Sequence, residues 1–293
     1  MALDERVKGK TAVLGLVGNP VEHSVSPQLH NTLSARLGND AVYIPMKVDP
    51  RRLGDAVNGF KAAGFKGFNV TIPFKEEIIK YVDVCSEEVK ITGSANTVRI
   101  AEDRTYAFST DGGGFVKSFE KETGLQFKGK RVLLLGAGGT ARALALKIAS
   151  EGAELAIANR TADRASGIAG MVRTHTTAAA EAFGLDRLED GAFLCGFDII
   201  VNTTSLGMHP NITESPLGEN VKLDPRQTVY DVIYNPARTR LLRQAEGCGC
   251  KAVNGMGMLF WQGVLAYEIW MENKIPEEIT NALWQDFSNY LGK

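Results

Sequence analysis

One segment constrains the fold more than any other, because it joins a buried strand to a glycine turn and a helix start. It reads Arg131-Val-Leu-Leu-Leu-Gly136-Ala-Gly138-Gly-Thr-Ala141-Arg142. Its unbroken apolar run is typical of a parallel strand that is covered on both faces. Gly136, Gly138 and Ala141 fit the pattern G-x-G-x-x-G/A, in which the first glycine makes the turn, the second admits a pyrophosphate and the small third residue packs helix on strand. The segment therefore predicts a dinucleotide site, with the N–H groups of the helix start available to the phosphates.

Strand and helix signals alternate along the rest of the chain. Strands are expected at residues 11–17, 41–47, 67–72, 97–100, 105–109, 131–135, 155–158, 198–202 and 228–232, and helices at 140–150, 161–172, 239–245 and 259–271. This alternation predicts an α/β, doubly wound architecture, and 293 residues are enough for two domains. The glycine run at 112–114 is the expected break between the domains, and Asn235-Pro236 marks a second break. The pattern leaves open which domain the helices after that second break join.

Charge balance and hydropathy exclude several classes of protein. The chain has 33 Lys and Arg against 34 Asp and Glu, so it lacks the basic footprint of a protein that binds nucleic acid or an anionic membrane. Mean hydropathy is -0.10, and no apolar run approaches the ~20 residues that a bilayer requires. The first ten residues, MALDERVKGK, are charged where a signal peptide is apolar. We therefore expect a cytoplasmic protein with neither a nucleic acid nor a membrane as partner.

The cysteines and histidines do not form a metal motif. Cys248 and Cys250 are close in sequence, but a lone Cys-Gly-Cys offers two of the four ligands that structural zinc requires. His23 and His30 are not accompanied by acidic or cysteine ligands at close spacing. We expect no metal, and we interpret the cysteines as small apolar residues in a reducing compartment.

The residues after the next strand indicate which dinucleotide is bound. Asn159 lies 23 residues after Gly136, close to the ~20 at which a Rossmann sheet places the residue that contacts the adenosine ribose. An NAD site has Asp or Glu there, whereas this chain has Asn159, Arg160 and Thr161, with Arg164 one turn later. A guanidinium suits a ribose 2′-phosphate, although an arginine at a helix start is also commonly just solvated. NADP is therefore the expected cofactor.

A pair of serines follows the first strand, in Gly18-Asn-Pro-Val-Glu-His-Ser24-Val-Ser26-Pro27. If this segment is extended, Ser24 and Ser26 point the same way. Ser26-Pro27 also has the pattern of an N-cap followed by proline at the first helical position. Two hydroxyls beside a helix N-terminus suit a carboxylate, but Ser26 serving only as a cap is an equally good interpretation.

Polar residues also follow two other strands, where open α/β sheets bind their ligands. Thr71 and Lys75 end the segment Asn69-Val-Thr71-Ile-Pro-Phe-Lys75, and Asp111 follows Thr110 just before the glycine run. An ammonium and a carboxylate near a carbonyl can move protons while a nicotinamide moves hydride. In isolation, a surface lysine and an aspartate in a turn are the simpler interpretation.

Nine motifs, in order and over nearly the whole chain, resemble those of the shikimate dehydrogenase family. They are Gly18-Asn-Pro-x-x-His-Ser-x-Ser-Pro, Asn69-Val-Thr-Ile-Pro-Phe-Lys, Gly93-Ser-Ala-Asn-Thr, Thr110-Asp, Gly136-Ala-Gly-Gly, Asn159-Arg-Thr, Val201-Asn-Thr-Thr-Ser-Leu-Gly-Met, Tyr230-Asp-Val-Ile-Tyr-Asn-Pro and Gly255-Met-Gly-Met-Leu-x-x-Gln. Each motif alone is modest, whereas nine in the family's order are specific.

This resemblance implies a fold and a reaction. The fold is an N-terminal α/β substrate domain, residues 1–111, completed by C-terminal helices 238–293, and a Rossmann-type parallel-sheet NADP-binding domain, residues 112–237. The reaction is the reversible reduction of 3-dehydroshikimate to shikimate by NADPH, in aromatic amino acid biosynthesis. The protein is expected as a monomer or homodimer.

The resemblance also implies roles for residues at the matching positions. Ser24 and Ser26 match the pair that holds the substrate carboxylate, and Lys75 matches the catalytic acid/base, with Asp111 beside it. Other residues that match substrate-binding positions of the family are Thr71, Asn96, Asp111, Tyr234 and Gln262. The residues that match its cofactor-binding positions are Gly136, Ala137, Gly138, Gly139, Thr140, Ala141, Asn159, Arg160, Thr161 and Arg164. Ile233 and Gly255 match positions near the nicotinamide, and Glu87 matches a position on the cofactor side.

One departure and two alternative functions accompany this interpretation. The family usually has Asn-Thr-Asp where this chain has Ser109-Thr110-Asp111, which puts the order of that loop in question. One alternative is a quinate/shikimate dehydrogenase of broader substrate and cofactor use, against which Ser26 and the Asn159-Arg160 pair argue. The other is a catalytically inactive nucleotide-sensing protein, against which the presence of both Lys75 and Asp111 argues.

Overall fold

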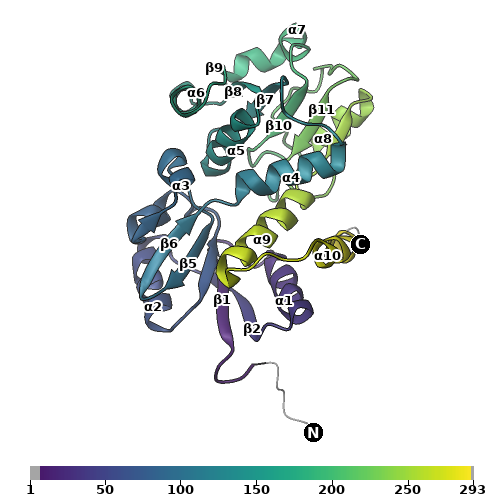
Figure 1. Cartoon of the computed structure of the whole chain (residues 1–293). Coiled ribbons are helices and arrows are strands. Elements are labelled where there is room, and N and C mark those ends of the chain that lie inside the picture. The colour runs from purple at the N-terminus through teal and green to yellow at the C-terminus, as the bar shows by residue number, and fades with distance from the viewer. Residues whose placement is uncertain (1–6, 292–293) are drawn as a thin grey trace. The chain divides into compact units, whose positions relative to one another are not determined.

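A computed structural model describes residues 7–291, which form two compact units (Figure 1). Unit 1 contains the described residues up to Thr110 and those from Gln262 onward, and unit 2 contains Asp111–Trp261. The chain therefore passes between the units twice. The first passage is at the start of helix α4 (Asp111–Thr123), and the second lies within helix α9 (Met256–Met271).

Unit 1 is built on a mixed sheet of six strands in the order β2-β1-β3-β5-β6-β4. Its strands are β1 (Ala12–Gly18), β2 (Ala41–Lys47), β3 (Gly67–Val70), β4 (Val84–Cys85), β5 (Thr97–Ala101) and β6 (Arg104–Phe108). Its helical segments, besides the second part of α9, are α1 (Ser26–Leu37), η1 (Pro50–Arg52), α2 (Leu53–Ala62), η2 (Glu77–Tyr81), α3 (Glu87–Thr92) and α10 (Glu277–Leu291). Strand β5 runs antiparallel to β3 and β6, and the other pairs are parallel.

Both faces of the sheet of unit 1 are covered by apolar side chains. On one face, residues of α2, η2 and α3 pack on the strands, and this cluster includes Val57, Phe68, Ile78 and Val89. On the other face, Trp270 of α9 donates from Nε1 to the Val98 carbonyl at 2.9 Å. Gly67 allows this contact, because a Cβ there would lie 2.4 Å from the Trp270 ring. This packing explains why the second part of α9 belongs to unit 1.

A histidine is buried in the aromatic layer on that second face. The His30 ring is fully buried and stacks on Tyr43, with ring centroids 4.3 Å apart. Trp270 and Tyr267 lie at 5.1 and 6.1 Å from the same ring. Burial lowers the pKa of His30 from 6.5 to about 3, because the imidazolium would lose its hydration.

This burial predicts a loss of stability in mild acid. The unfolded chain takes up a proton at His30 below about pH 6.5, whereas the folded protein does not until about pH 3, so stability falls as pH falls between these values. The wild type should therefore lose about 2 kcal/mol more than His30→Phe between pH 7 and 5. Thermal unfolding at both pH values measures this difference, with His175→Gln, at an exposed histidine, as the control. Parallel curves for wild type and His30→Phe would contradict the expectation.

Unit 2 contains a six-stranded sheet that is parallel throughout. Its strands are β7 (Arg131–Leu135), β8 (Glu154–Ala158), β9 (Ala180–Phe183), β10 (Ile199–Asn202), β11 (Thr228–Asp231) and β12 (Lys251–Val253). Its helical segments, besides α4 and the first part of α9, are α5 (Gly139–Ser150), α6 (Ala162–His175), η3 (Leu185–Glu189), α7 (Gly191–Leu194) and α8 (Arg240–Gly247). The order β12-β11-β10-β7-β8-β9 is that of a Rossmann sheet, with its switch point between β7 and β10. The predicted α/β fold with a parallel nucleotide-binding sheet is confirmed.

The expected break at the glycine run 112–114 lies next to the observed boundary, which falls between Thr110 and Asp111, and the run itself forms part of the first turn of α4. Gly112 is needed for helix packing, because a Cβ there would lie 2.9 Å from the Ala143 carbonyl oxygen of α5. Residues 238–261 do not return to the first unit, because β12 pairs with β11 and α8 packs on both strands. Of the segment 238–293 that was expected to complete the first domain, only the described residues from Gln262 onward belong to unit 1, so that expectation is wrong for residues 238–261.

Among the helices of residues 7–291, none combines the length and the apolar character needed to cross a membrane.

Candidate active site and cofactor site

One edge of the sheet in unit 1 gathers most of the predicted substrate residues. The parallel strands β1 and β3 end there, and Ser24, Thr71 and Lys75 follow them. Because β5 is antiparallel to β3 and β6, its start and the end of β6 meet at the same edge. Asn96 directly precedes β5, and Thr110 lies two residues after β6. The topology therefore brings four segments that are separate in sequence to one edge.

The two serines lie at the start of α1 in a turn rather than in an extended segment. Val25 has φ -95° and ψ 3°, so the segment is not extended, and the condition under which Ser24 and Ser26 would point the same way is not met. Ser26 is also not the N-cap: it is the first helical residue, and Val25 precedes it without a side-chain cap. The Ser24 hydroxyl oxygen instead accepts from the Ser26 N–H at 3.2 Å. Both hydroxyls nevertheless lie at the positive end of a twelve-residue helix, where an anion is favoured.

Thr71 and Lys75 are held close to the end of β1. The Thr71 N–H donates to the Val17 carbonyl at 2.9 Å, and a Cβ at Gly18 would lie 2.4 Å from Thr71 Cγ2. The Lys75 carbonyl accepts from the Ala95 N–H at 2.8 Å, which ties the lysine's turn to the segment that leads into Asn96. The Lys75 side chain is half-buried, while the preceding Phe74 is buried as an anchor.

Asn96 and Gln262 are joined by hydrogen bonds. Asn96 Nδ2 donates to Gln262 Oε1 at 3.1 Å and to Thr110 Oγ1 at 2.8 Å. Asn96 Oδ1 in turn accepts from the Thr110 N–H at 2.8 Å. These two hydrogen bonds to Asn96 hold both the backbone and the side chain of Thr110 in place. The backbone of the loop is therefore anchored at Thr110, although position 109 is a serine.

The hydrogen-bond chain continues through residues for which no role was predicted. Asn69 Nδ2 donates to the Asn96 carbonyl and to Thr97 Oγ1, both at 3.1 Å. The Tyr43 hydroxyl donates to Asn69 Oδ1 at 2.9 Å and also contacts Ser26, and burial raises the pKa of Tyr43. The Asn69 motif was noticed in the sequence, but only the sheet register reveals that its side chain reaches Asn96.

Asp111 contacts the first turn of α5. It is buried at the N-terminus of α4, and the Thr140 hydroxyl donates to Asp111 Oδ2 at 3.4 Å. Within unit 2, the structure therefore brings a predicted catalytic residue next to a residue of the predicted cofactor shell.

The glycine turn of unit 2 fits a dinucleotide. Gly136 has φ +109°, and a Cβ there would lie 2.6 Å from Thr203 Oγ1, so a side chain is excluded. Gly138 is exposed, with no atom within 4 Å of an added Cβ, and it precedes α5 without a side-chain cap. The first N–H groups of α5 are thus available to phosphate, while buried Ala141 packs beneath the turn. Ala137 is buried, and Gly139 begins the helix.

The residues expected at the adenosine ribose lie between β8 and α6. Asn159 Nδ2 donates to the Thr161 carbonyl at 3.0 Å, which shapes the turn into the helix. Arg160, Thr161 and Arg164 are all exposed at this helix start, as a cationic contact to a 2′-phosphate requires.

The remaining predicted residues lie in three places. Ile233 and Gly255 are joined by a backbone hydrogen bond, in which the Gly255 N–H donates to the Ile233 carbonyl at 3.0 Å. A Cβ at Gly255 would lie 2.0 Å from the Val232 carbonyl oxygen, so this approach requires glycine. Tyr234 is half-buried, and burial raises its pKa. Glu87 lies in unit 1, as the exposed first residue of α3, where it is paired with Lys90.

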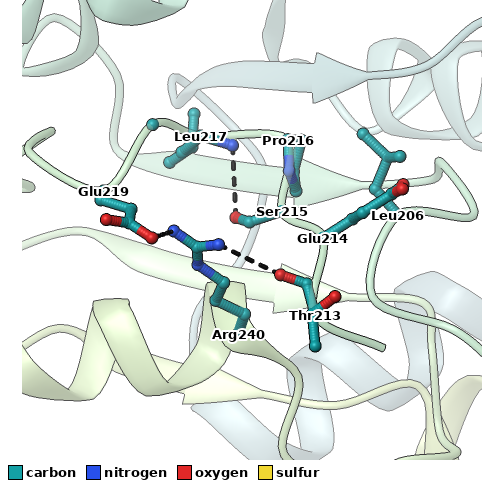
Figure 2. A pocket seen from close by; sticks show the side chains of 9 residues that line it. Leu206, Thr213, Glu214, Ser215, Pro216, Leu217, Glu219 and Arg240 are labelled. Carbon is teal, nitrogen blue, oxygen red and sulfur yellow. Dashed lines mark hydrogen bonds and ion pairs between the residues drawn. The ribbon is translucent and has the colours of Figure 1, made fainter. Parts of the chain in front are cut away.

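A pocket of about 430 Å³ in unit 2 was not predicted (Figure 2). It lies along the loop after β10 and is lined by Leu206, Thr213, Glu214, Ser215, Pro216, Leu217, Gly218, Glu219 and Arg240. The Arg240 guanidinium donates to the Thr213 carbonyl at 3.1 Å and forms an ion pair with Glu219. The loop that lines the pocket is therefore anchored to α8.

These features place the chain in the class of two-unit α/β proteins with a Rossmann-type dinucleotide-binding unit.

Two family models match the chain. The model described as the shikimate dehydrogenase substrate binding domain matches residues 16–98, and that described as shikimate / quinate 5-dehydrogenase matches residues 118–232.

Individual relatives agree with the family models. The shikimate dehydrogenase (NADP+) of Methanopyrus kandleri is 42% identical over 280 residues, which cover 95% of this chain and 97% of the relative. A crystal structure of shikimate dehydrogenase in complex with NADP+ has a TM-score of 0.86 at 37% identity, covering 96% of both chains. The ligand-free 5-ketofructose reductase of Gluconobacter sp. strain CHM43 has a TM-score of 0.81 at 34% identity, covering 97% of this chain and 100% of its own. The chain belongs to the shikimate dehydrogenase family.

Proposed function

We propose that this protein catalyses the reversible, NADPH-dependent reduction of 3-dehydroshikimate to shikimate, a step of aromatic amino acid biosynthesis. The observation that carries the proposal is the shared edge of the sheet in unit 1. A helix-start serine pair for a carboxylate, polar groups for ring hydroxyls and one lysine for a proton all belong to that edge. A hydroxylated ring acid with a carbonyl needs these three kinds of partner.

The cofactor is NADP, held by the glycine turn and by the residues after β8. When bound, NADPH supplies the hydride for the carbonyl carbon. Gly136 and Gly138 leave room for the pyrophosphate, and the start of α5 offers N–H donors. Arg160, Thr161 and Arg164 are proposed to hold the 2′-phosphate, and Asn159 shapes their turn without the negative charge that an aspartate would bring.

The protein's chemical contribution is proton transfer and orientation. As the carbonyl carbon is reduced, its oxygen gains negative charge and takes a proton from the Lys75 ammonium; in the oxidation direction Lys75 accepts that proton. Asp111 is proposed to contact the same substrate oxygen and to orient the exchange. Thr71, Asn96, Tyr234 and Gln262 are proposed to bind the substrate's other polar groups, and Ile233, Gly255 and Glu87 to lie on the cofactor's side.

The competing function is a quinate/shikimate dehydrogenase, because the second family model is described with both substrates. The 5-ketofructose reductase also shows that this architecture is found with another substrate. Oxidation of NADPH with 3-dehydroshikimate, 3-dehydroquinate and 5-ketofructose, followed by identification of the product, separates these functions. The proposal expects shikimate as the preferred product, and no turnover of 3-dehydroshikimate would overturn it.

The serine pair gives a test of substrate orientation. Ser24→Ala and Ser26→Ala should each weaken substrate binding by about 1.5–3 kcal/mol, the range for hydrogen bonds to a charged group. This corresponds to a rise in substrate KM of roughly 10- to 150-fold. Ser34→Ala is a matched control, because Ser34 is a buried serine of the same helix whose hydroxyl bonds to His30 and Tyr267.

The two possible roles of the serines give different results. A carboxylate contact predicts that a substrate analogue without the carboxylate binds wild type and both variants equally. If Ser26→Ala lowers thermal stability and leaves KM unchanged, the serine only supports the fold.

We also propose the cytoplasm as the compartment, since all four cysteines are free thiols, as is typical of a reducing environment. The assembly is proposed as a monomer or homodimer.

A further inference from the structure

Two buried polar side chains mark the two ends of strand β11. Asp231 is the last residue of the strand and is fully buried, while Gln227 directly precedes the strand and is 2% exposed. Asp231 lies at the edge where the glycine turn follows β7, because β7, β10 and β11 are parallel. Gln227 lies at the opposite edge.

Asp231 uses both carboxylate oxygens to accept from three donors, one at the end of β10 and two in the chain that follows β11. Its Oδ1 accepts from Asn202 Nδ2 at 3.0 Å and from the Ile233 N–H at 3.1 Å. Its Oδ2 accepts from the Thr239 hydroxyl at 2.7 Å. Burial raises the pKa of Asp231 to about 6, and these three hydrogen bonds oppose the rise.

Through Asn202, the carboxylate is linked to the loop that packs on the glycine turn. Asn202 Oδ1 accepts from the Thr204 N–H at 3.0 Å and from its hydroxyl at 2.7 Å. The neighbouring Thr203 hydroxyl donates to the Leu135 carbonyl at 2.7 Å, directly before Gly136. Because Thr203 is the residue that an added Cβ at Gly136 would strike, the position of this loop sets the shape of the turn.

Through Ile233 and Thr239, the carboxylate is linked to the other side of the same edge. The Ile233 carbonyl accepts a hydrogen bond from the Gly255 N–H. Because the Ile233 N–H in turn donates to Asp231, the carboxylate also fixes the Gly255 segment. Thr239 is the N-cap of α8, where its hydroxyl oxygen accepts from the Leu242 N–H at 3.3 Å. The next residue, Arg240, holds the far part of the loop after β10 (Figure 2).

We propose that Asp231 is a positioning residue for cofactor binding, which holds the 203–206 loop and the Ile233–Gly255 contact around the glycine turn. This inference rests on the proposed function, in which the glycine turn, Ile233 and Gly255 surround NADP. Asp231 itself acts through other residues and is not assigned a contact to the cofactor.

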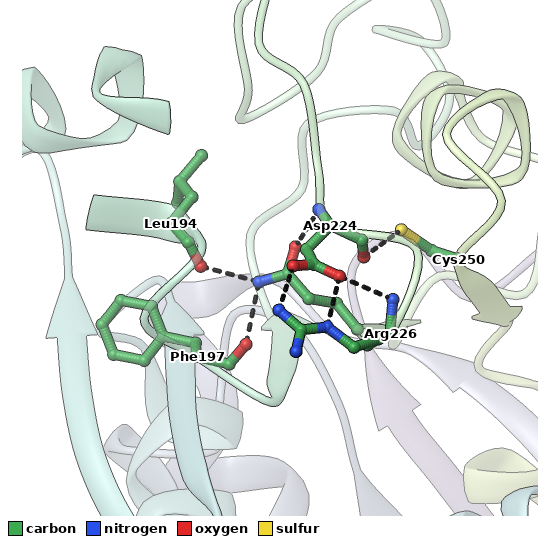
Figure 3. A network of polar contacts seen from close by, with 6 residues as sticks. Leu194, Phe197, Asp224, Arg226 and Cys250 are labelled. Carbon is green, nitrogen blue, oxygen red and sulfur yellow. Dashed lines mark hydrogen bonds and ion pairs between the residues drawn. The ribbon is translucent and has the colours of Figure 1, made fainter. Parts of the chain in front are cut away.

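The strand supplies its own control at the other end. Gln227 Nε2 donates to the carbonyls of Leu194 and Phe197 at 2.6 and 2.8 Å, and its Oε1 accepts from the Asp224 N–H at 2.9 Å. Figure 3 shows this network around Asp224, Leu194 and Phe197. Like Asp231, Gln227 is buried, lies at an end of β11 and makes three hydrogen bonds. Replacing Gln227 should therefore lower the stability of the fold without changing the edge of the sheet that carries the glycine turn.

The test compares Asp231→Ala, Asp231→Asn and Gln227→Ala by Tm, by the Kd for NADP from fluorescence titration, and by KM for NADP and for shikimate. Both alanine variants should lower Tm. Only Asp231→Ala should raise the Kd and KM for NADP, by about tenfold or more, with KM for shikimate within about twofold of wild type. Asp231→Asn keeps the shape and one acceptor oxygen, so it should recover most of the affinity.

A second variant keeps the test decisive if Asp231→Ala does not fold. Thr204→Val leaves Asp231 in place but removes the hydroxyl hydrogen bond to Asn202, one of the two that hold the loop, so it should also raise the Kd for NADP. Equal rises in Kd for Gln227→Ala, or unchanged Kd values for Asp231→Ala or Thr204→Val, would overturn the inference. If the unmutated protein does not bind NADP, the proposed function fails and this inference with it, whereas a failure confined to the variants overturns only the role of Asp231.

Discussion

Replacing Lys75 with alanine is expected to lower kcat by ~10²–10⁴-fold, with little change in KM for either substrate. The reason is chemical: hydride delivery to a ketone leaves an alkoxide that needs a proton, and Lys75 is the ammonium group assigned to supply it. Steady-state rates in both directions measure the loss.

A neighbouring lysine provides the control for this substitution. Lys80 lies in η2, a few residues after Lys75, and its exposed ammonium is paired with Glu77 at 2.8 Å. Exposed pairs of this kind contribute little to stability, so Lys80→Ala should leave both rate and fold intact. A Lys75→Ala enzyme with near-normal kcat would contradict the assignment, and a variant with raised KM alone would make Lys75 a binding residue.

Replacing Arg160 with alanine should raise KM for NADP by roughly 10²-fold and leave the weak activity with NAD almost unchanged. Two charge-assisted hydrogen bonds at ~1.5–3 kcal/mol each suffice for a preference of 10²-fold or more. Because Arg160 and Arg164 are exposed, added salt should reduce the preference.

The control for Arg160 is an arginine at the opposite edge of the same sheet. Arg226 is exposed, precedes β11 and pairs with Asp224 at 2.6 Å (Figure 3). Arg226→Ala should change neither cofactor's KM. If Arg160→Ala weakens NADP and NAD equally, then Arg160 supports the fold of the turn rather than recognising the phosphate.

The parts of the fold that could be predicted from sequence are those whose signal is local. The strand at 131–135 is buried on both faces and therefore uninterrupted in its apolar character, and it is observed with the same bounds as β7. The strands β4 and β12 were not predicted, because they contain only two and three residues, and β9 was not predicted because its sequence, Ala-Glu-Ala-Phe, has no β-branched residue. Their identity depends on pairing with a neighbour.

The role of glycine could be predicted where it makes a turn but not where it packs a helix. Gly136 has the positive φ that its place in the motif predicts. The run that contains Gly112 was expected to mark the break between the domains, which lies beside it, but its packing role, which lets α4 approach Ala143 and Lys147 of α5, was not predicted. A glycine run has the same sequence in both situations, and only the partner helix distinguishes them.

The candidate site residues came from motifs, but the contacts between them could not come from sequence. Asn96 and Gln262 are 166 residues apart and meet because β5 and the second part of α9 belong to one unit. Asp231 was part of a motif without an assigned role, and one of its three donors, Asn202, lies on the neighbouring strand β10, 29 residues away. Long-range contacts of this kind follow from sheet register, which a single sequence does not fix.

The most direct test of the central claim is kcat/KM for the four combinations of shikimate or quinate with NADP or NAD. The proposed site predicts the highest value for shikimate with NADP. With shikimate as the substrate, exchanging NADP for NAD should lower kcat/KM about 10²-fold or more, because NAD lacks the 2′-phosphate that Arg160 is proposed to bind. Equal values for the two cofactors would contradict the NADP site, and equal or higher values for quinate would make the protein a quinate/shikimate dehydrogenase instead.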